Sequence, residues 1–188
     1  MRTTNDYSKV IAVLFLVLAV VLRFFPHPAN FVPIGALGLF AGCYLRGWAL
    51  WLVPLGAMAI SDWIGHVLQV PGMGFYSTTS LAFVYGGLAL GGLLGILLRD
   101  RVGPLSVFSA AAANASVFFV VSNFGVWLSE IAGYEKSLAG LATCYYQAIP
   151  FFRNSLLADV FYTALFFGVY QLIGSYLLVP ATEPNKAS

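Results

Sequence analysis

The sequence predicts an all-α integral membrane protein with about six transmembrane helices. Of its 188 residues, 60% are hydrophobic and only 9% are charged, and the mean hydropathy is +0.87. Soluble domains carry about 25% charged residues, so this chain has too few to cover a water-exposed surface. A spanning helix needs about 20 mainly apolar residues. Glycine, proline and charged residues divide the chain into six segments of roughly that length, and these define the expected helices.

The expected helices form a single domain over residues 1–180, followed by a polar tail at 181–188. Arg2 and Lys9 precede the first segment, as in a signal peptide. That segment has no small-residue cleavage site and runs on to Arg23, so we expect a retained helix. Helices are favoured because every backbone polar group must be satisfied inside the hydrocarbon. The expected helices cover residues 8–25, 31–45, 48–68, 78–98, 104–128 and 151–179.

The boundaries follow from local signals. The short second segment stops at "LRGW", the third contains Pro54, and the fourth is rich in glycine. The fifth begins at Pro104 after the charged "LRDRVGP". Before the last segment, the moderately polar "SEIAGYEKSLAGLATCYYQAIP" is predicted to be a connection rather than a helix.

The basic residues predict that both termini face the cytoplasm. With the N-terminus inside, six basic residues fall on the cytoplasmic side and three on the opposite side, as the positive-inside rule requires. The cytoplasmic group is Arg2, Lys9, Arg46, Arg99, Arg101 and Lys186, and the other group is Arg23, Lys136 and Arg153.

Several function classes receive little support. The net charge of +2 is too small and too scattered for a nucleic-acid partner. Cys43 and Cys144 have neither CxxC nor zinc-finger spacing, so no metal site or disulfide framework is expected. The chain has no phosphate-cradling loop, so it does not hydrolyse ATP by itself.

Polar and ionisable side chains collect towards the outer half of this topology. Ionisable residues inside a membrane are costly, so they are candidates for function. Their convergence predicts one outward-facing pocket for a small-molecule ligand. Two histidines among them would make binding sensitive to pH near neutrality. The candidate substrate-binding residues are His27, Asn30, Asp62, His66, Tyr76, Asn123, Trp127, Tyr145, Arg153 and Asp159.

These candidates also have structural interpretations. Asp62 and His66 lie four residues apart on one helix face and could pair with each other. Arg153 could reach the lipid headgroups or pair with Asp159. The aromatic candidates could belong to the interfacial belt of a membrane protein. Two asparagines could provide hydrogen bonds between helices, namely Asn114 and Asn123.

Glycines recur every fourth residue on two expected helices. Such faces let helix backbones approach closely, and the simplest interpretation is packing within the chain. The alternative is docking against a partner subunit or a second copy. The glycines are Gly38 and Gly42 on the second helix, and Gly87, Gly91 and Gly95 on the fourth.

A series of motifs resembles an uncharacterised bacterial membrane family that is grouped by similarity with the S components of energy-coupling factor (ECF) vitamin transporters. The motifs include "FPHPANFVPIGALGLFAGCYL", "VPLGAMAISDWIG", "STTSLAFVYG", "SNFGVWLS" and "GLATCYYQAIPFFRNSLLADVFY". The resemblance spans about residues 22–170, and the run 123–159 is its most specific part.

This resemblance implies a multi-pass protein of the bacterial inner membrane that captures a vitamin-like molecule in an outward-facing pocket. Loops between helices one and two, three and four, and five and six would build the site, with His27 and Asn30 in the first gating loop. The resemblance also suggests a relationship to solitary S-component-like carriers of cobalamin, which makes cobalamin a suggested transported ligand rather than a cofactor. The implied partners are the lipid bilayer and either an energising module or a second copy of the chain.

Two features depart from the S-component pattern. Ala12 and Ala19 lie seven residues apart on an otherwise bulky first helix, which lacks the small-residue stripe for docking an energising subunit. No soft ligand clearly marks a cobalt site, so cobalamin is suggested by the relatives alone.

Two other classes remain as alternatives to a non-enzymatic carrier. Asp62 and Asp159 could form the carboxylate pair of an intramembrane protease, but the chain lacks the GxGD, HExxH and GxSxG motifs. The polar outer end could instead serve a protein partner, which would make the chain a structural or assembly subunit.

Overall fold

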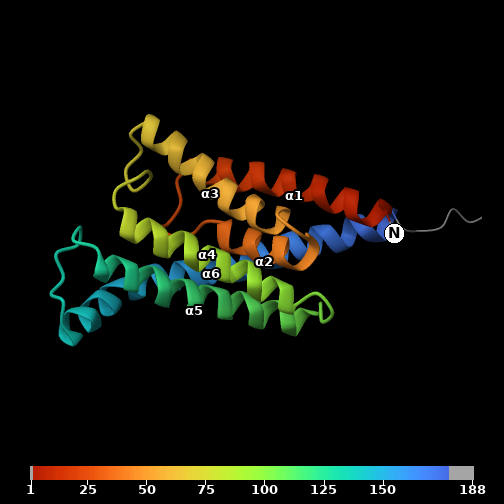
Figure 1. Ribbon diagram of the computed structural model, residues 1–188. Coiled ribbons are helices and arrows are strands. Elements are labelled where there is room, and N and C mark those ends of the chain that lie inside the picture. The colour runs from red at the N-terminus through yellow and green to blue at the C-terminus, as the bar shows by residue number, and fades with distance from the viewer. Residues whose placement is uncertain (1, 178–188) are drawn as a thin grey trace, which may run out of the picture.

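Six α-helices form one bundle, and residues 2–177, which the computed structural model describes, contain no strand. Side chains are described over residues 7–175, so the polar tail at 181–188 and Lys186 lie outside the described residues. The expected all-α fold with six helices is confirmed. Figure 1 shows α1 (Arg2–Leu22), α2 (Ile34–Tyr44), α3 (Ala49–Val67), α4 (Thr78–Leu97), α5 (Pro104–Leu128) and α6 (Leu138–Leu177).

The bundle has two distinct ends. The start of α1 and the end of α6 lie together in Figure 1, with the connections at 45–48 and 98–103, and we call this the terminus end. The connections at 23–33, 68–77 and 129–137 lie at the opposite end, the loop end. The two connections that carry sequence candidates, 23–33 with His27 and Asn30 and 68–77 with Tyr76, therefore lie at the same end.

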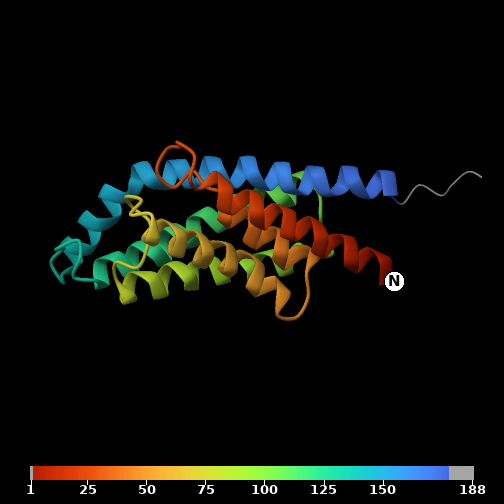
Figure 2. The same cartoon turned by 90° about the horizontal axis from the view of Figure 1, so that it is seen from above.

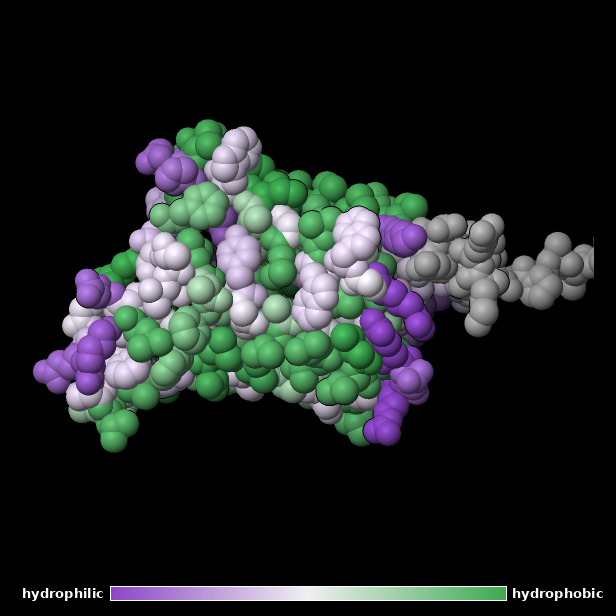
Figure 3. All heavy atoms as spheres, in the orientation of Figure 1, coloured by the Kyte–Doolittle hydropathy of each residue, from purple (hydrophilic) through white to green (hydrophobic). Residues whose placement is uncertain are grey.

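The surface between these ends is that of a membrane protein. By length and composition, α3, α4, α5 and α6 can each cross a membrane, and α1 and α2 contain shorter apolar segments. Large apolar side chains are exposed on every helix except α2. Figure 3 shows polar residues gathered at the two ends, with a mainly apolar band between them. The chain is thus a helical membrane protein.

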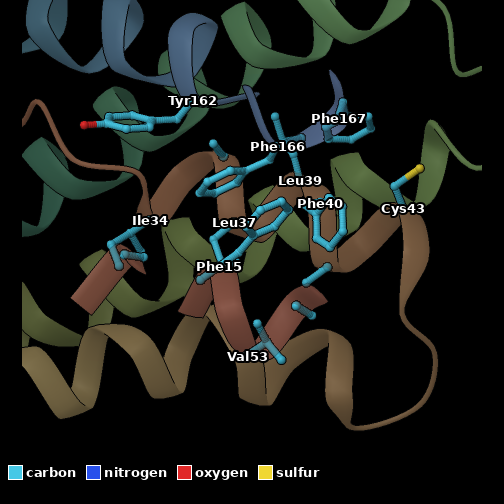
Figure 4. Close-up of a cluster of buried hydrophobic side chains, with 14 of the residues drawn as sticks. Phe15, Ile34, Leu37, Leu39, Phe40, Cys43, Val53, Tyr162, Phe166 and Phe167 are labelled. Atoms are coloured by element: carbon cyan, nitrogen blue, oxygen red, sulfur yellow. The ribbon is translucent and has the colours of Figure 1, made fainter. Parts of the chain in front are cut away.

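The short helix α2 is the centre of the bundle. It contacts each of the other five helices, and nine of its 11 residues are buried. Phe40 packs against Phe15, with ring centroids 5.0 Å apart, and Phe15 stacks on Phe166 at 4.2 Å (Figure 4). At about 1.5 Å per residue, α2 is only about 16 Å long, which is roughly half the hydrocarbon thickness.

Close backbone packing holds α2 against α4. A Cβ atom added at Gly42 or Gly95 would collide with the backbone of the other helix. An added Cβ at Gly38 would lie 3.5 Å from the carbonyl oxygen of Leu88. The glycines of α2 and Gly95 therefore serve packing within the chain.

Helix α6 begins much earlier than expected. It starts at Leu138 rather than residue 151, so the second part of the predicted connection, residues 138–150, is helical, while 129–137 do form a connection. Proline normally interrupts a helix because it lacks an N–H and clashes with the preceding turn. Here Pro150 lies inside α6, and Figure 2 shows that the segment before it turns away from the rest of the helix. That segment packs on α5, where the Tyr145 hydroxyl donates to the Val120 carbonyl oxygen at 2.7 Å.

Two other boundaries also differ. α1 covers Arg2–Leu22 instead of 8–25, because polar residues can continue a helix beyond the hydrocarbon and the prolines after residue 25 exclude further turns. α2 begins at Ile34 instead of 31, directly after Pro33, which precedes the helix without a side-chain cap.

Candidate functional site

A buried ion pair joins the end of α1 to α3. Arg23 follows the last residue of α1, and its Nη1 lies 2.9 Å from Oδ1 of Asp62. The same nitrogen donates to the Ser61 hydroxyl, and Oδ2 of Asp62 accepts from the Tyr85 hydroxyl at 3.2 Å. Arg23 is 9% exposed and Asp62 is 2% exposed. Buried charges need such partners, because water no longer solvates them.

A second buried polar pair joins α5 to α6. Asn114 Nδ2 donates to Oδ2 of Asp159 at 2.7 Å, and both residues are buried. An added Cβ at Gly35 would collide with Oδ1 of Asp159, and one at Gly91 would collide with the amide oxygen of Asn114. Glycine at these two positions leaves room for the polar pair between α2 and α4.

Both polar groups border one cavity of about 450 Å³. The cavity lies in the loop half of the bundle. It lies beyond the first turn of α2, in the part of the bundle through which the central helix does not extend. Arg23 reaches it from α1, Met58 from α3, Phe118 from α5 and Asp159 from α6. The position of the cavity follows from the half-length of α2, which fills the centre of the bundle only towards the terminus end.

Two loops at the loop end contribute to the cavity wall. Asn30, in the first loop, has a φ of 63°, and Gly72, in the second, has a φ of 79°. The first loop is tied to α6, because Asn154 Nδ2 donates to the Ala29 carbonyl oxygen at 2.9 Å. These loops lie between the cavity and the aqueous side of the loop end.

The sequence candidates fall into three groups. His27, Asn30 and Asp159 line the cavity. Asp62 holds the Arg23 side chain that lines it. The other candidates lie outside its wall.

His66 and Tyr76 line a neighbouring pocket of about 560 Å³, which shares the loop at 70–73 with the first cavity. The His66 ring contacts Phe75, with centroids 5.8 Å apart, and does not pair with Asp62, which is engaged by Arg23. Desolvation raises the pKa of the Tyr76 hydroxyl, and the Asp62 carboxylate acts in the same direction, so Tyr76 keeps its proton at physiological pH.

The remaining candidates lie on α5 and α6 outside the cavity. Asn123 donates to the Phe119 carbonyl oxygen of its own helix at 2.8 Å. Trp127 Nε1 donates to the Glu135 carbonyl oxygen at 2.9 Å, and Tyr145 donates to Val120 as described above. Arg153 is exposed, and Asp159 pairs with Asn114 instead of with it. Of these bonds, the one from Tyr145 joins α6 to α5, and the one from Trp127 joins α5 to the loop that follows it.

Sequence reasoning missed several residues of the cavity wall. The sequence places Arg23 only among the outer basic residues, because an arginine directly after an apolar helix usually reaches the headgroups instead of turning inward. Asn114 was considered only as a hydrogen-bond donor between helices, which it is, but it also lines the cavity. The other missed residues include Gly35, Met58, Met73, Phe118 and Ser155.

The fold and this cavity define the class: a six-helix membrane protein with a partly enclosed cavity at one end, whose mainly apolar wall contains a few buried polar groups. The chain belongs to a family of unknown function, DUF6580, which matches it over residues 3–182. No curated protein and no solved structure matches the chain.

Proposed function

We propose that the protein is a multi-pass carrier of the bacterial inner membrane that captures a small vitamin-like molecule in this cavity and carries it across, as its resemblance to ECF S components implies. The observation that supports this most is the cavity of about 450 Å³ with Arg23 and Asp159 in its wall. Ionisable residues inside membrane proteins usually mark substrate or ion pathways. Small-molecule sites typically measure about 300–1,000 Å³.

The proposed orientation places the loop end outside the cell. Three basic residues, Arg46, Arg99 and Arg101, lie in the connections of the terminus end, which the positive-inside rule assigns to the cytoplasm. Both termini are then cytoplasmic. The cavity opens to the outside, where a nutrient would arrive.

The cavity favours a compact ligand. Its walls combine a few polar groups with apolar side chains such as Met58, Met73 and Phe118, which is the usual composition of a small-molecule site. Cobalamin is far larger than 450 Å³ can hold. Vitamins of the size of biotin, thiamine or pyridoxine suit the volume better.

The transport step needs movement at two places. The loops that carry Asn30 and Gly72 would close over the ligand from outside. Release to the cytoplasm requires α2 to shift, because α2 fills the terminus half of the bundle beneath the cavity. The energy comes from a partner module, a gradient or trapping of the ligand inside the cell.

The test is a thermal unfolding screen of the purified protein in mild detergent against biotin, thiamine, riboflavin, the pyridoxine group, cobinamide and cobalamins. A ligand that binds only the folded state raises the unfolding midpoint. We expect one compact vitamin to do so. Riboflavin and the corrinoids serve as size controls.

Two tryptophan variants locate the binding. Ser155 lines the cavity, and its hydroxyl donates only to the Phe151 carbonyl oxygen of its own helix. Ser155→Trp should fill the cavity and abolish the ligand-dependent shift. Ser175→Trp changes an exposed serine at the terminus end, whose hydroxyl also bonds within its helix, and should keep the shift. A stable protein with no response to any compound would overturn the proposal and favour a structural or assembly subunit.

A further inference from the structure

The charges around the cavity do not balance. Arg23 and Asp62 form an ion pair at 2.9 Å, so their formal charges cancel. His27 lines the cavity as a half-buried residue whose two ring nitrogens lie against backbone carbonyl oxygens, Nδ1 2.8 Å from that of Pro28 and Nε2 3.4 Å from that of Arg23. Asp159 is left as an acidic residue of the wall whose side-chain partner is not basic. Among the residues that the structure describes, Asn114 is its only side-chain partner, and Asn114 is neutral.

Two neutral groups lie beside the carboxyl group of Asp159. Asn114 donates to Oδ2, while Oδ1 lies against the backbone of Gly35 in the first turn of α2. The N-terminal turn of a helix carries a partial positive charge, which attracts an anion. Neither group supplies a full positive charge, and a buried carboxylate without one is costly in a membrane.

The rest of the wall suits an organic cation. Phe118 offers an aromatic ring, and Met58 and Met73 offer polarisable thioethers, all within the same cavity. Aromatic faces attract ammonium and other organic cations. The only arginine in the wall has its charge neutralised by Asp62, so it repels such a ligand much less than a lone arginine would.

We infer that the ligand carries a positively charged nitrogen, which binds to the carboxylate of Asp159, so that the cavity selects small organic cations such as protonated amines and quaternised heterocycles. This inference rests on the proposed function, because it names the ligand class of the same cavity. Arg23 lines the cavity beside the first loop, so its guanidinium can donate to an acceptor group of the same ligand.

The experiment compares compounds that are alike in shape and differ in charge. The probes are pyridoxamine against pyridoxine and benzylamine against benzyl alcohol, with thiamine as a permanently charged heterocycle. Binding to the full-length protein in mild detergent is measured by calorimetry and by the unfolding midpoint. We expect at least one cationic probe to bind about tenfold or more tightly than a neutral partner, since a charge-assisted hydrogen bond contributes that much.

Two variants assign this preference to Asp159. Asp159→Asn keeps the shape and an oxygen that accepts from Asn114, and it should remove the preference for the cationic probe. Ser175→Ala, at the exposed serine of the terminus end outside the cavity, should retain it. The unliganded unfolding midpoint of each variant shows whether it folds. If Asp159→Asn does not fold, the charge preference of the unaltered protein still decides the inference.

The outcomes separate this inference from the proposed function. Binding of a neutral or anionic vitamin in preference to every cationic probe overturns the cation inference and leaves the carrier proposal standing. A cation preference that survives in a folded Asp159→Asn protein also overturns it. Failure of every compound in both sets overturns both proposals together.

Discussion

The two halves of the bundle around α2 are filled in opposite ways. In the terminus half, α2 presents Phe40 to Phe15, and stacked rings fill the centre. In the loop half, beyond Ile34, the centre holds a cavity bordered by two buried polar pairs. The difference teaches that a site can be created by the length of one element. A central helix of 11 residues completes the core at one end and leaves a space at the other.

The largest expected effect comes from disturbing the terminus half. A Cβ at Gly95 would collide with the Leu39 carbonyl oxygen and with Gly42, so Gly95→Leu must push α2 away from α4. Overpacking by a few atoms already costs about 1–3 kcal/mol, and here backbone stands in the way. We expect almost no monodisperse protein in size-exclusion chromatography.

The matched control for this variant lies on the same helix. A Cβ at Gly86 would meet no atom within 4 Å, so Gly86→Leu should give the yield and elution volume of the unaltered protein. Equal yields for the two variants would show that the α2–α4 contact is not what holds the central helix in place.

The next effect concerns the polar pair at α1 and α3. Asp62→Asn leaves the buried charge of Arg23 without its carboxylate, and we expect a loss of about 3 kcal/mol or more in the free energy of unfolding. Replacing both partners, as Arg23→Met with Asp62→Leu, should recover most of that loss, because the uncompensated charge is then gone. Reversible unfolding in mixed detergent micelles measures both variants. If the double variant is as unstable as Asp62→Asn, the ion pair stabilises the fold by more than the mutual neutralisation of its two charges.

The smallest effect concerns the cover of the cavity. Asn154→Ala removes one hydrogen bond to the Ala29 carbonyl oxygen, worth about 1 kcal/mol. We expect faster amide hydrogen exchange in residues 24–33 and little change elsewhere, because the loop would open locally while the bundle stays folded. Ser155→Ala, whose hydroxyl bonds only within α6, should leave that exchange unchanged. A uniform increase across all helices would argue against a local role.

The sequence predicts the fold well because composition and length act on each helix separately. The regions that the sequence does not predict depend on contacts between helices. The moderately polar stretch 129–150 looks like a connection that ends at a proline, yet residues 138–150 pack on α5 and belong to α6, which continues through Pro150. The pairing of Arg23 with Asp62 cannot be predicted from the sequence either, since neither segment indicates that the end of α1 lies beside α3.

The candidate site divides in the same way. The outer half was expected to hold a pocket, and His27, Asn30 and Asp159 were selected because polar residues are rare in this chain. Trp127 and Tyr145 were selected for the same reason, yet they bond to backbone carbonyls on α5 and the loop that follows it. Rarity identifies unusual residues, but the rotation of each helix decides whether a side chain faces a cavity, and a single sequence does not reveal that rotation.

The hydrogen bonds at the end of α2 bear on how the chain assembles during synthesis. Arg99, just after α4, donates to the carbonyl oxygens of Gly42 and Leu45 at 2.9 and 2.8 Å. An apolar segment of 10–14 residues is too short to insert across a bilayer on its own. When α2 leaves the ribosome, it is therefore too short to span the bilayer, and α4 and Arg99 are not yet present to contact it. α4 and Arg99 follow α2 in the chain, so the contacts that hold α2 at the centre of the bundle can form only after these later segments have been synthesised.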